Sequence, residues 1–135
     1  MKKYLLALVL WSPLLFADNA PDNVAPKILL IGDSIGASYG VPTEEGWTHL
    51  LAKKLKDSGH PHEVVNASIS GDTTRGGRQR IKRTLETHQP AIVLLELGGN
   101  DGLRGLPLKE MRKNLIAMIE AAQQHKAHIA LLGMQ

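Results

Sequence analysis

Three residues in this sequence, Ser34, Gly71 and Asn100, have the types that acyl transfer requires, and each follows a short apolar run. A serine hydroxyl can act as a nucleophile. The oxyanion that then develops on a carbonyl oxygen needs hydrogen-bond donors, which a glycine N–H without a blocking side chain and an Asn amide can supply. Gly, Asp and Ser also favour ordinary turns for backbone reasons alone, so the prediction depends on whether the fold brings the three positions together.

Short apolar runs alternate with segments of helical periodicity. Strands are predicted for residues 28–31, 63–67, 91–97 and 127–133, and helices for residues from about 44 to 58, from 74 to 87, and from 107 onward. Fully apolar strands indicate a parallel sheet with both faces covered. The alternating order predicts right-handed crossovers with helices on both faces. All βα loops then lie at one edge of the sheet, where we expect Ser34, Gly71 and Asn100 to converge.

Composition and charge describe one globular domain. The chain has 135 residues, of which 43% are hydrophobic, and a formal charge of +3. Loss of Lys2 and Lys3 with a cleaved signal would leave a charge of about +1, which argues against a nucleic-acid binder. The absence of cysteine excludes disulfides, cysteine zinc sites and a thiol nucleophile.

The first residues have the pattern of a secretory signal peptide. Lys2 and Lys3 precede an apolar stretch of about 13 residues, 4–16, and Ala17 is a candidate cleavage point. A membrane-spanning helix needs roughly 20 apolar residues, so no stable membrane anchor is expected after cleavage. We therefore predict a signal peptide at 1–17, a short mature leader at 18–26 and a single domain at 27–135, located in the periplasm or secreted.

Three sequence blocks resemble the SGNH or GDSL hydrolase family. Gly-Asp-Ser at 32–34, a glycine at 71 and Gly-Gly-Asn-Asp at 98–101 occur in the family's order, each at a predicted strand end. The sequence at 96–105 resembles the periplasmic subgroup of this family, which includes arylesterases, thioesterases and lysophospholipases. The resemblance covers about residues 28–132.

This resemblance implies a three-layer α/β/α flavodoxin-like fold and a serine esterase or thioesterase. Ser34 would be the nucleophile, and the oxyanion hole would comprise the Ser34 and Gly71 N–H groups and the Asn100 side chain. Asp33 and Asp101 belong to the matching blocks and would support the site. The substrate would be a small-molecule or lipid acyl ester or thioester, with no metal or cofactor.

The family's C-terminal Asp-x-x-His block, which supplies the catalytic base, does not occur where it is expected. The literal match at 57–60 lies between a predicted helix and strand, at the edge opposite Ser34. The remaining histidines are at 49, 62, 88, 125 and 128, and none is expected to reach Ser34. We therefore expect the sequence to be the N-terminal portion of a hydrolase, with the catalytic His and Asp absent and with little activity of its own.

Two other interpretations stay open. The chain could be a non-catalytic remnant that keeps an oxyanion-like pocket. It could also be a flavodoxin-like phosphate or nucleotide binder that uses residues 70–74 and the nearby arginines, although neither the Walker nor the dinucleotide glycine spacing occurs. Gly32 to Gly36 also fits the Gly-x-Ser-x-Gly elbow of α/β-hydrolases, but in that fold the serine follows several earlier strands.

Overall fold

The computed structural model describes residues 24–133, so the predicted signal peptide lies outside the described part. In that part the strands β1 (Lys27–Gly32), β2 (Glu63–Asn66), β3 (Ile92–Glu96) and β4 (His128–Leu131) form one parallel sheet in the order β2-β1-β3-β4. They alternate with the 3-10 turn η1 (Thr43–Glu45) and the helices α1 (Trp47–Asp57), α2 (Thr74–His88), α3 (Gly99–Leu103) and α4 (Leu108–Gln124).

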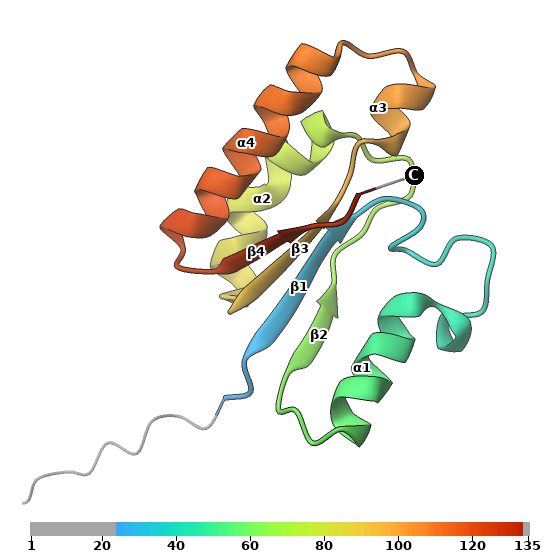
Figure 1. Cartoon of the computed structure of the whole chain (residues 1–135), viewed down its shortest axis with the longest axis vertical. Helices are drawn as coiled ribbons and strands as arrows, with labels where there is room; N and C mark the ends of the chain where they lie inside the picture. The colour runs from blue at the N-terminus through green and yellow to red at the C-terminus, as the bar shows by residue number, and fades with distance from the viewer. Residues whose placement is uncertain (1–23, 134–135) are drawn as a thin grey trace, which may run out of the picture.

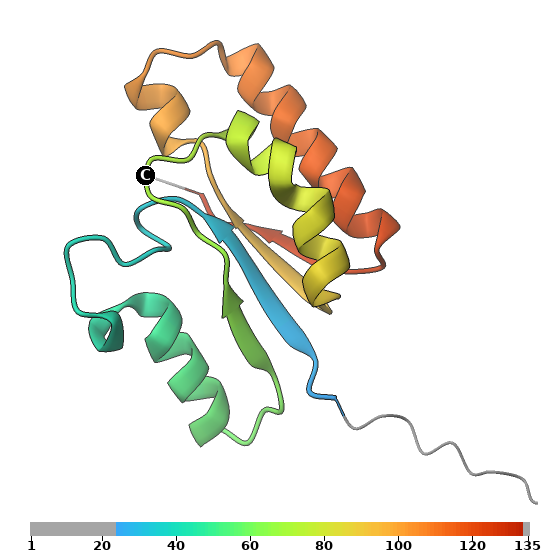
Figure 2. The same cartoon turned by 180° about the vertical axis from the view of Figure 1, so that it is seen from behind.

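The sheet lies between two helical layers, as Figure 1 and the reverse view in Figure 2 show. Helices α2 and α4 cover one face, while α1 lies on the other face beside β2. Successive side chains of a strand point to opposite faces, so Leu29 and Ile31 of β1 point toward α2 and α4, whereas Leu30 points toward the side of α1. The predicted parallel α/β fold with helices on both faces is confirmed.

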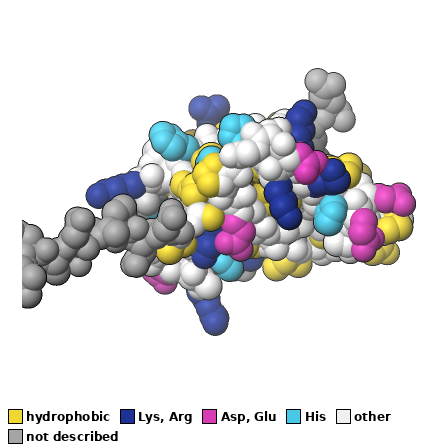
Figure 3. Space-filling model, turned by 90° about the horizontal axis from the view of Figure 1, so that it is seen from below, with side chains coloured by type: hydrophobic (Ala, Val, Ile, Leu, Met, Phe, Trp, Pro, Cys, Tyr) yellow, Lys and Arg dark blue, Asp and Glu magenta, His cyan; other side chains and the backbone are white. Residues whose placement is uncertain are grey.

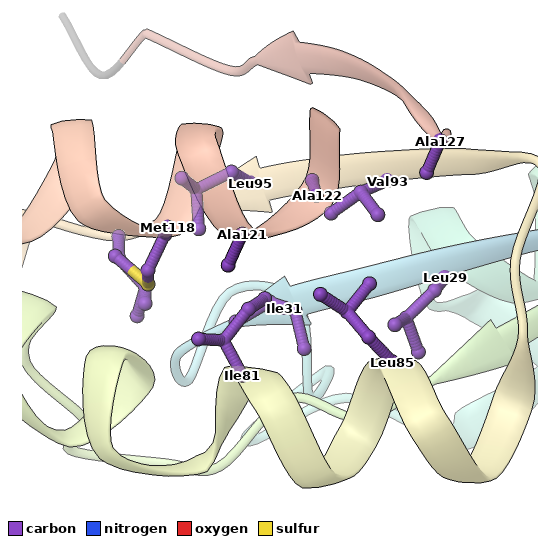
Figure 4. Close-up of a cluster of buried hydrophobic side chains, with 11 residues drawn as sticks. Leu29, Ile31, Ile81, Leu85, Val93, Leu95, Met118, Ala121, Ala122 and Ala127 are labelled. Atoms are coloured by element: carbon purple, nitrogen blue, oxygen red, sulfur yellow. The ribbon is translucent and has the colours of Figure 1, made fainter. Parts of the chain in front are cut away.

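The main hydrophobic core fills the space between the sheet and the pair α2 and α4 (Figure 4). Leu29, Leu85, Val93 and Met118 are fully buried there. Gly77 of α2 packs so closely that a Cβ atom at this position would collide with the side chains of Leu97 and Met118. The glycine thus reduces the helix propensity of α2 but lets α2 approach β3 and α4.

Two local predictions were wrong. Glu44 and Glu45 do not begin α1 but form η1, and the extended backbone of Gly46 (φ −65°, ψ 138°) separates this turn from the helix. The segment after β3 was predicted as a loop, yet residues 99–103 form the short helix α3. Among the described residues, no helix combines the length and the apolar character that crossing a membrane requires.

Candidate active site

The turn after β1 presents Ser34 at the carboxyl edge of the sheet. The chain leaves the strand at Gly32 and folds back on itself through the bonds Ala37 N to Asp33 O at 2.9 Å and Tyr39 N to Ser34 O at 2.9 Å. The buried Asp33 carboxylate accepts a further bond from Ile35 N at 3.0 Å. Ser34 itself is half-buried.

The amide of Asn100 connects the other strand ends to this turn. Asn100 lies in the first turn of α3, directly after β3. Its Nδ2 donates to the carbonyl oxygen of Asp72, at 2.8 Å, and to Asp33 Oδ2, at 3.2 Å. A single side chain therefore joins the loops after β1, β2 and β3, and the convergence expected for Ser34, Gly71 and Asn100 is what the structure shows. A substrate carbonyl would have to replace one of the two bonds, and the longer one, to Asp33, is the weaker.

Gly71 has the left-handed backbone conformation that favours glycine, with φ +80°. Its carbonyl oxygen accepts a hydrogen bond from Arg104 Nη2 at 2.8 Å, which ties the loop after β2 to the segment after α3. Among the hydrogen bonds of residues 24–133, none uses the N–H of Gly71 or of Ser34. Both N–H groups are thus available to a carbonyl oxygen placed at this edge.

Asp101 is buried and bonds to α2, so it supports the loop of Asn100 and does not face Ser34. Its carboxylate is 2% exposed and accepts bonds from Thr74 N at 2.8 Å and Thr74 Oγ1 at 2.5 Å. Asn114 of α4 donates to Thr74 Oγ1 at 3.2 Å, so the network joins α2, α3 and α4. Asp101 accepts the N–H of Thr74, and Thr73 Oγ1 accepts that of Gly76, so two N–H groups at the start of α2 already have partners within the chain. The network therefore gives no support to an anion cradle at residues 70–74.

Glu96 is a residue of this region to which the sequence analysis gave no role. It ends β3 opposite Gly32, is 4% exposed, and has no hydrogen-bond partner for either carboxylate oxygen among the described residues. Burial, followed by the nearby charge of Asp33, raises the pKa of Glu96 to about 7. In the sequence, the one feature that could have indicated a role for Glu96 is that it is the single charged residue of an otherwise apolar strand.

The histidines lie away from Ser34, as expected. His60 and His62 precede β2, His88 ends α2, His125 follows α4 and His128 begins β4, so all five lie toward the opposite edge of the parallel sheet. Figure 3, which looks at the molecule from below, shows histidine side chains spread over this end. His49 is exposed in the first turn of α1, and no hydrogen bond of the described residues joins a histidine to Ser34.

A cavity of about 510 Å³ lies between the starts of α2 and α4. Its lining includes Arg75, Arg78, Leu106 and Glu110, but not Ser34, Gly71 or Asn100. We assign it no part in the chemistry of the carboxyl edge. Within residues 24–133, no three His, Asp or Glu side chains are grouped as a metal ion would need.

The sequence is similar to those of known proteins. Residues 30–135 match the sequence profile of the GDSL-like Lipase/Acylhydrolase family. The chain is 48% identical to the Esterase TesA of Pseudomonas aeruginosa, over 82% of this chain and 55% of the relative. It is 39% identical to the Thioesterase 1/protease 1/lysophospholipase L1 of Escherichia coli K12, over 82% of this chain and 52% of the relative.

The fold of this chain is also similar to that of a solved esterase structure. The psychrotrophic esterase EstA from Pseudoalteromonas sp., inhibited by monoethylphosphonate, superimposes with a TM-score of 0.77 at 44% identity. The match covers 80% of this chain and 59% of that one. The chain thus spans little more than half the length of the relatives it matches.

Proposed function

Because the chain belongs to the GDSL-like lipase/acylhydrolase family, we propose that it carries the nucleophile and the oxyanion hole of a serine hydrolase for acyl esters and thioesters. The observation that carries this proposal is the Asn100 amide, which holds the loops after β1, β2 and β3 at one edge. Relatives named as esterase, thioesterase and lysophospholipase support the same substrate class.

In the proposed reaction, Ser34 Oγ attacks the carbonyl carbon of the ester or thioester and its proton passes to a base. The carbonyl oxygen becomes an oxyanion, which the Ser34 and Gly71 N–H groups and the Asn100 amide stabilise. The C–O or C–S bond then breaks, and the alcohol or thiol leaves with a proton. Water later cleaves the acyl group from Ser34 and restores the hydroxyl.

The base is the component that residues 24–133 do not place beside Ser34. A serine hydroxyl is a weak nucleophile without one, and in a serine protease the loss of the histidine alone lowers turnover by about 10⁶-fold. We therefore propose that this chain by itself hydrolyses esters slowly. The pattern of residues 1–17 supports export to the periplasm or secretion.

Chemical rescue tests the proposal. Free imidazole supplies a general base, so we expect a fluorophosphonate probe to modify the chain faster as imidazole is added, with mass spectrometry locating the adduct on Ser34. Ser34→Ala should abolish this labelling. Ser58→Ala, which removes an exposed serine at the end of α1, should leave it unchanged.

Two results would contradict the proposal. Labelling that persists in Ser34→Ala would show that another group reacts. A folded chain that stays unlabelled at every imidazole concentration would favour the alternative of a non-catalytic remnant.

A further inference from the structure

A buried carboxylic acid lies directly beneath the turn that carries Ser34. Glu96 points to the face of the sheet that carries α1, because Val93 and Leu95 of the same strand point into the core on the opposite face. A Cβ atom at Gly32 would lie 2.6 Å from Glu96 Oε2, and one at Gly36 would lie 2.7 Å from it. The two glycines on either side of Ser34 thus leave the space that the Glu96 carboxyl group occupies.

Ionised Glu96 would be poorly accommodated in this space. Its two oxygens and the neighbouring Ser68 Oγ are buried, and none of the three has a hydrogen-bond partner among residues 24–133. An ionised carboxylate can only accept hydrogen bonds, and its burial without donors is costly. A protonated carboxyl group, in contrast, is also a donor, and Asp33 directly follows Gly32, the residue that Glu96 pairs with between β1 and β3.

The Asp33 carboxyl group accepts two hydrogen bonds at the site. Its Oδ1 accepts the N–H of Ile35, which follows Ser34 in the turn, and its Oδ2 accepts the amide of Asn100. Both contacts use the Asp33 carboxyl group as an acceptor in a fixed direction. Two adjacent buried carboxyl groups resist double ionisation, and the raised pKa of Glu96 assigns the shared proton to Glu96.

We propose that Glu96 is a positioning residue: as a neutral acid it donates a hydrogen bond to the Asp33 carboxylate and fixes the direction in which this carboxylate holds the Asn100 amide. Its role as a positioning residue for catalysis rests on the proposed function. Loss of the proton places a second negative charge beside Asp33, which displaces Asp33 and changes the hydrogen bonds of Asn100. The burial and the Asp33 charge that raise the pKa of Glu96 to about 7 agree with this role.

Other charged groups near this edge are already paired on the opposite face. Arg80 of α2 forms an ion pair with Asp72 at 2.9 Å and donates to the carbonyl oxygens of Ala67 and Gly32. Asp101 of α3 is bonded to Thr74. From α1, β2 and the loop after β2, the side chains near this region are the uncharged Thr48, Asn66 and Ser68. Among the described residues, Asp33 is the charge that acts on Glu96.

Carboxyl and amide NMR of the whole chain tests the proposal without any turnover. We expect the ¹³Cδ resonance of Glu96 to titrate with a midpoint near pH 7, and the Asn100 side-chain amide to shift with the same midpoint. Glu96→Gln should remove that step from the Asn100 amide. Glu63→Gln, which alters an exposed acid at the start of β2, should retain it.

Two outcomes would overturn the proposal. One is a Glu96 midpoint near the ordinary value of 4.5. The other is an Asn100 amide that does not respond while Glu96 titrates, because Glu96 would then be a buried acid without influence on the site. Both signals come from the unmodified chain, so the test does not depend on whether Glu96→Gln folds. Failure of Ser34 labelling would contradict the proposed function and leave this titration unaffected.

Discussion

The carboxylate of Asp101 accepts two hydrogen bonds from Thr74, one from its backbone N at 2.8 Å and one from its Oγ1 at 2.5 Å. Both residues are buried. Asp101 follows Asn100 in α3, and Thr74 is the first residue of α2. This pair therefore fixes α3 against α2, and with α3 it fixes the position from which Asn100 reaches the strand ends.

Removing the Asp101 carboxylate should destabilise the fold. Asp101→Ala leaves the N–H and hydroxyl of Thr74 buried without their acceptor, so we expect the free energy of unfolding to fall by about 2–4 kcal/mol in urea titrations at pH 7. The matched variant Asp57→Ala loses an exposed ion pair with Lys53 and should cost less than about 0.5 kcal/mol. Equal effects of the two variants would show that the buried network contributes little.

Helix α2 should tolerate no side chain at Gly77. Alanine favours helices over glycine by about 1 kcal/mol, but a Cβ here collides with Leu97 and Met118, so we expect Gly77→Ala to destabilise the chain by about 1–3 kcal/mol. Gly102→Ala in α3 meets no neighbouring atom within 4 Å and should be neutral or stabilising. Thermal unfolding of both variants distinguishes packing from propensity, and a stabilised Gly77→Ala would rule out the close packing.

Replacing Asn100 should lower the rate at which Ser34 is acylated. Loss of one oxyanion donor typically lowers rates by about 10²–10³-fold, and we expect a decrease of about that size for Asn100→Ala in imidazole-assisted labelling of Ser34. Asn114→Ala is the matched control, because it removes a buried amide from the Thr74 network and leaves the Asp33 contact intact. Acylation rates of folded Asn100→Ala that equal those of the unmodified chain would exclude the amide from the oxyanion hole.

Stability should depend on pH through Glu96. Its pKa is raised in the folded chain from 4.5 to about 7, so folding strengthens proton binding and the favourable contribution is complete below about pH 4.5. As pH rises from 4.5 to 7, this contribution is lost, by at most about 3.5 kcal/mol at roughly 1.4 kcal/mol for each pH unit. Urea titrations from pH 4 to 8 should show the loss relative to Glu96→Gln, whose amide cannot ionise. A constant difference between the two proteins would contradict a raised pKa.

The sequence was sufficient to predict where the three candidate residues lie. Ser34, Gly71 and Asn100 each follow an apolar strand, and parallel strands bring their carboxyl ends to one edge whatever the details of packing. The order of the elements therefore predicted the site without any knowledge of side-chain contacts. The roles of the three residues in catalysis stay predictions until the labelling experiments are done.

The contacts that hold the site could not be predicted in the same way. Helix α3 is rich in glycine, and its low intrinsic helix propensity gave no signal. Asp101 and Thr74 are 27 positions apart, and nothing local in the sequence links them. Glu96 looked like an isolated charge in a strand, because its partner Asp33 approaches it only when β3 lies beside β1.

The strand order has a consequence for assembly of the sheet. β1 is the first strand in the sequence and occupies an interior position, with β2 added on one side, β3 on the other, and β4 on β3. After β2 pairs with β1, each later strand therefore has its partner earlier in the sequence, so the carboxyl edge with Ser34 can be assembled in chain order.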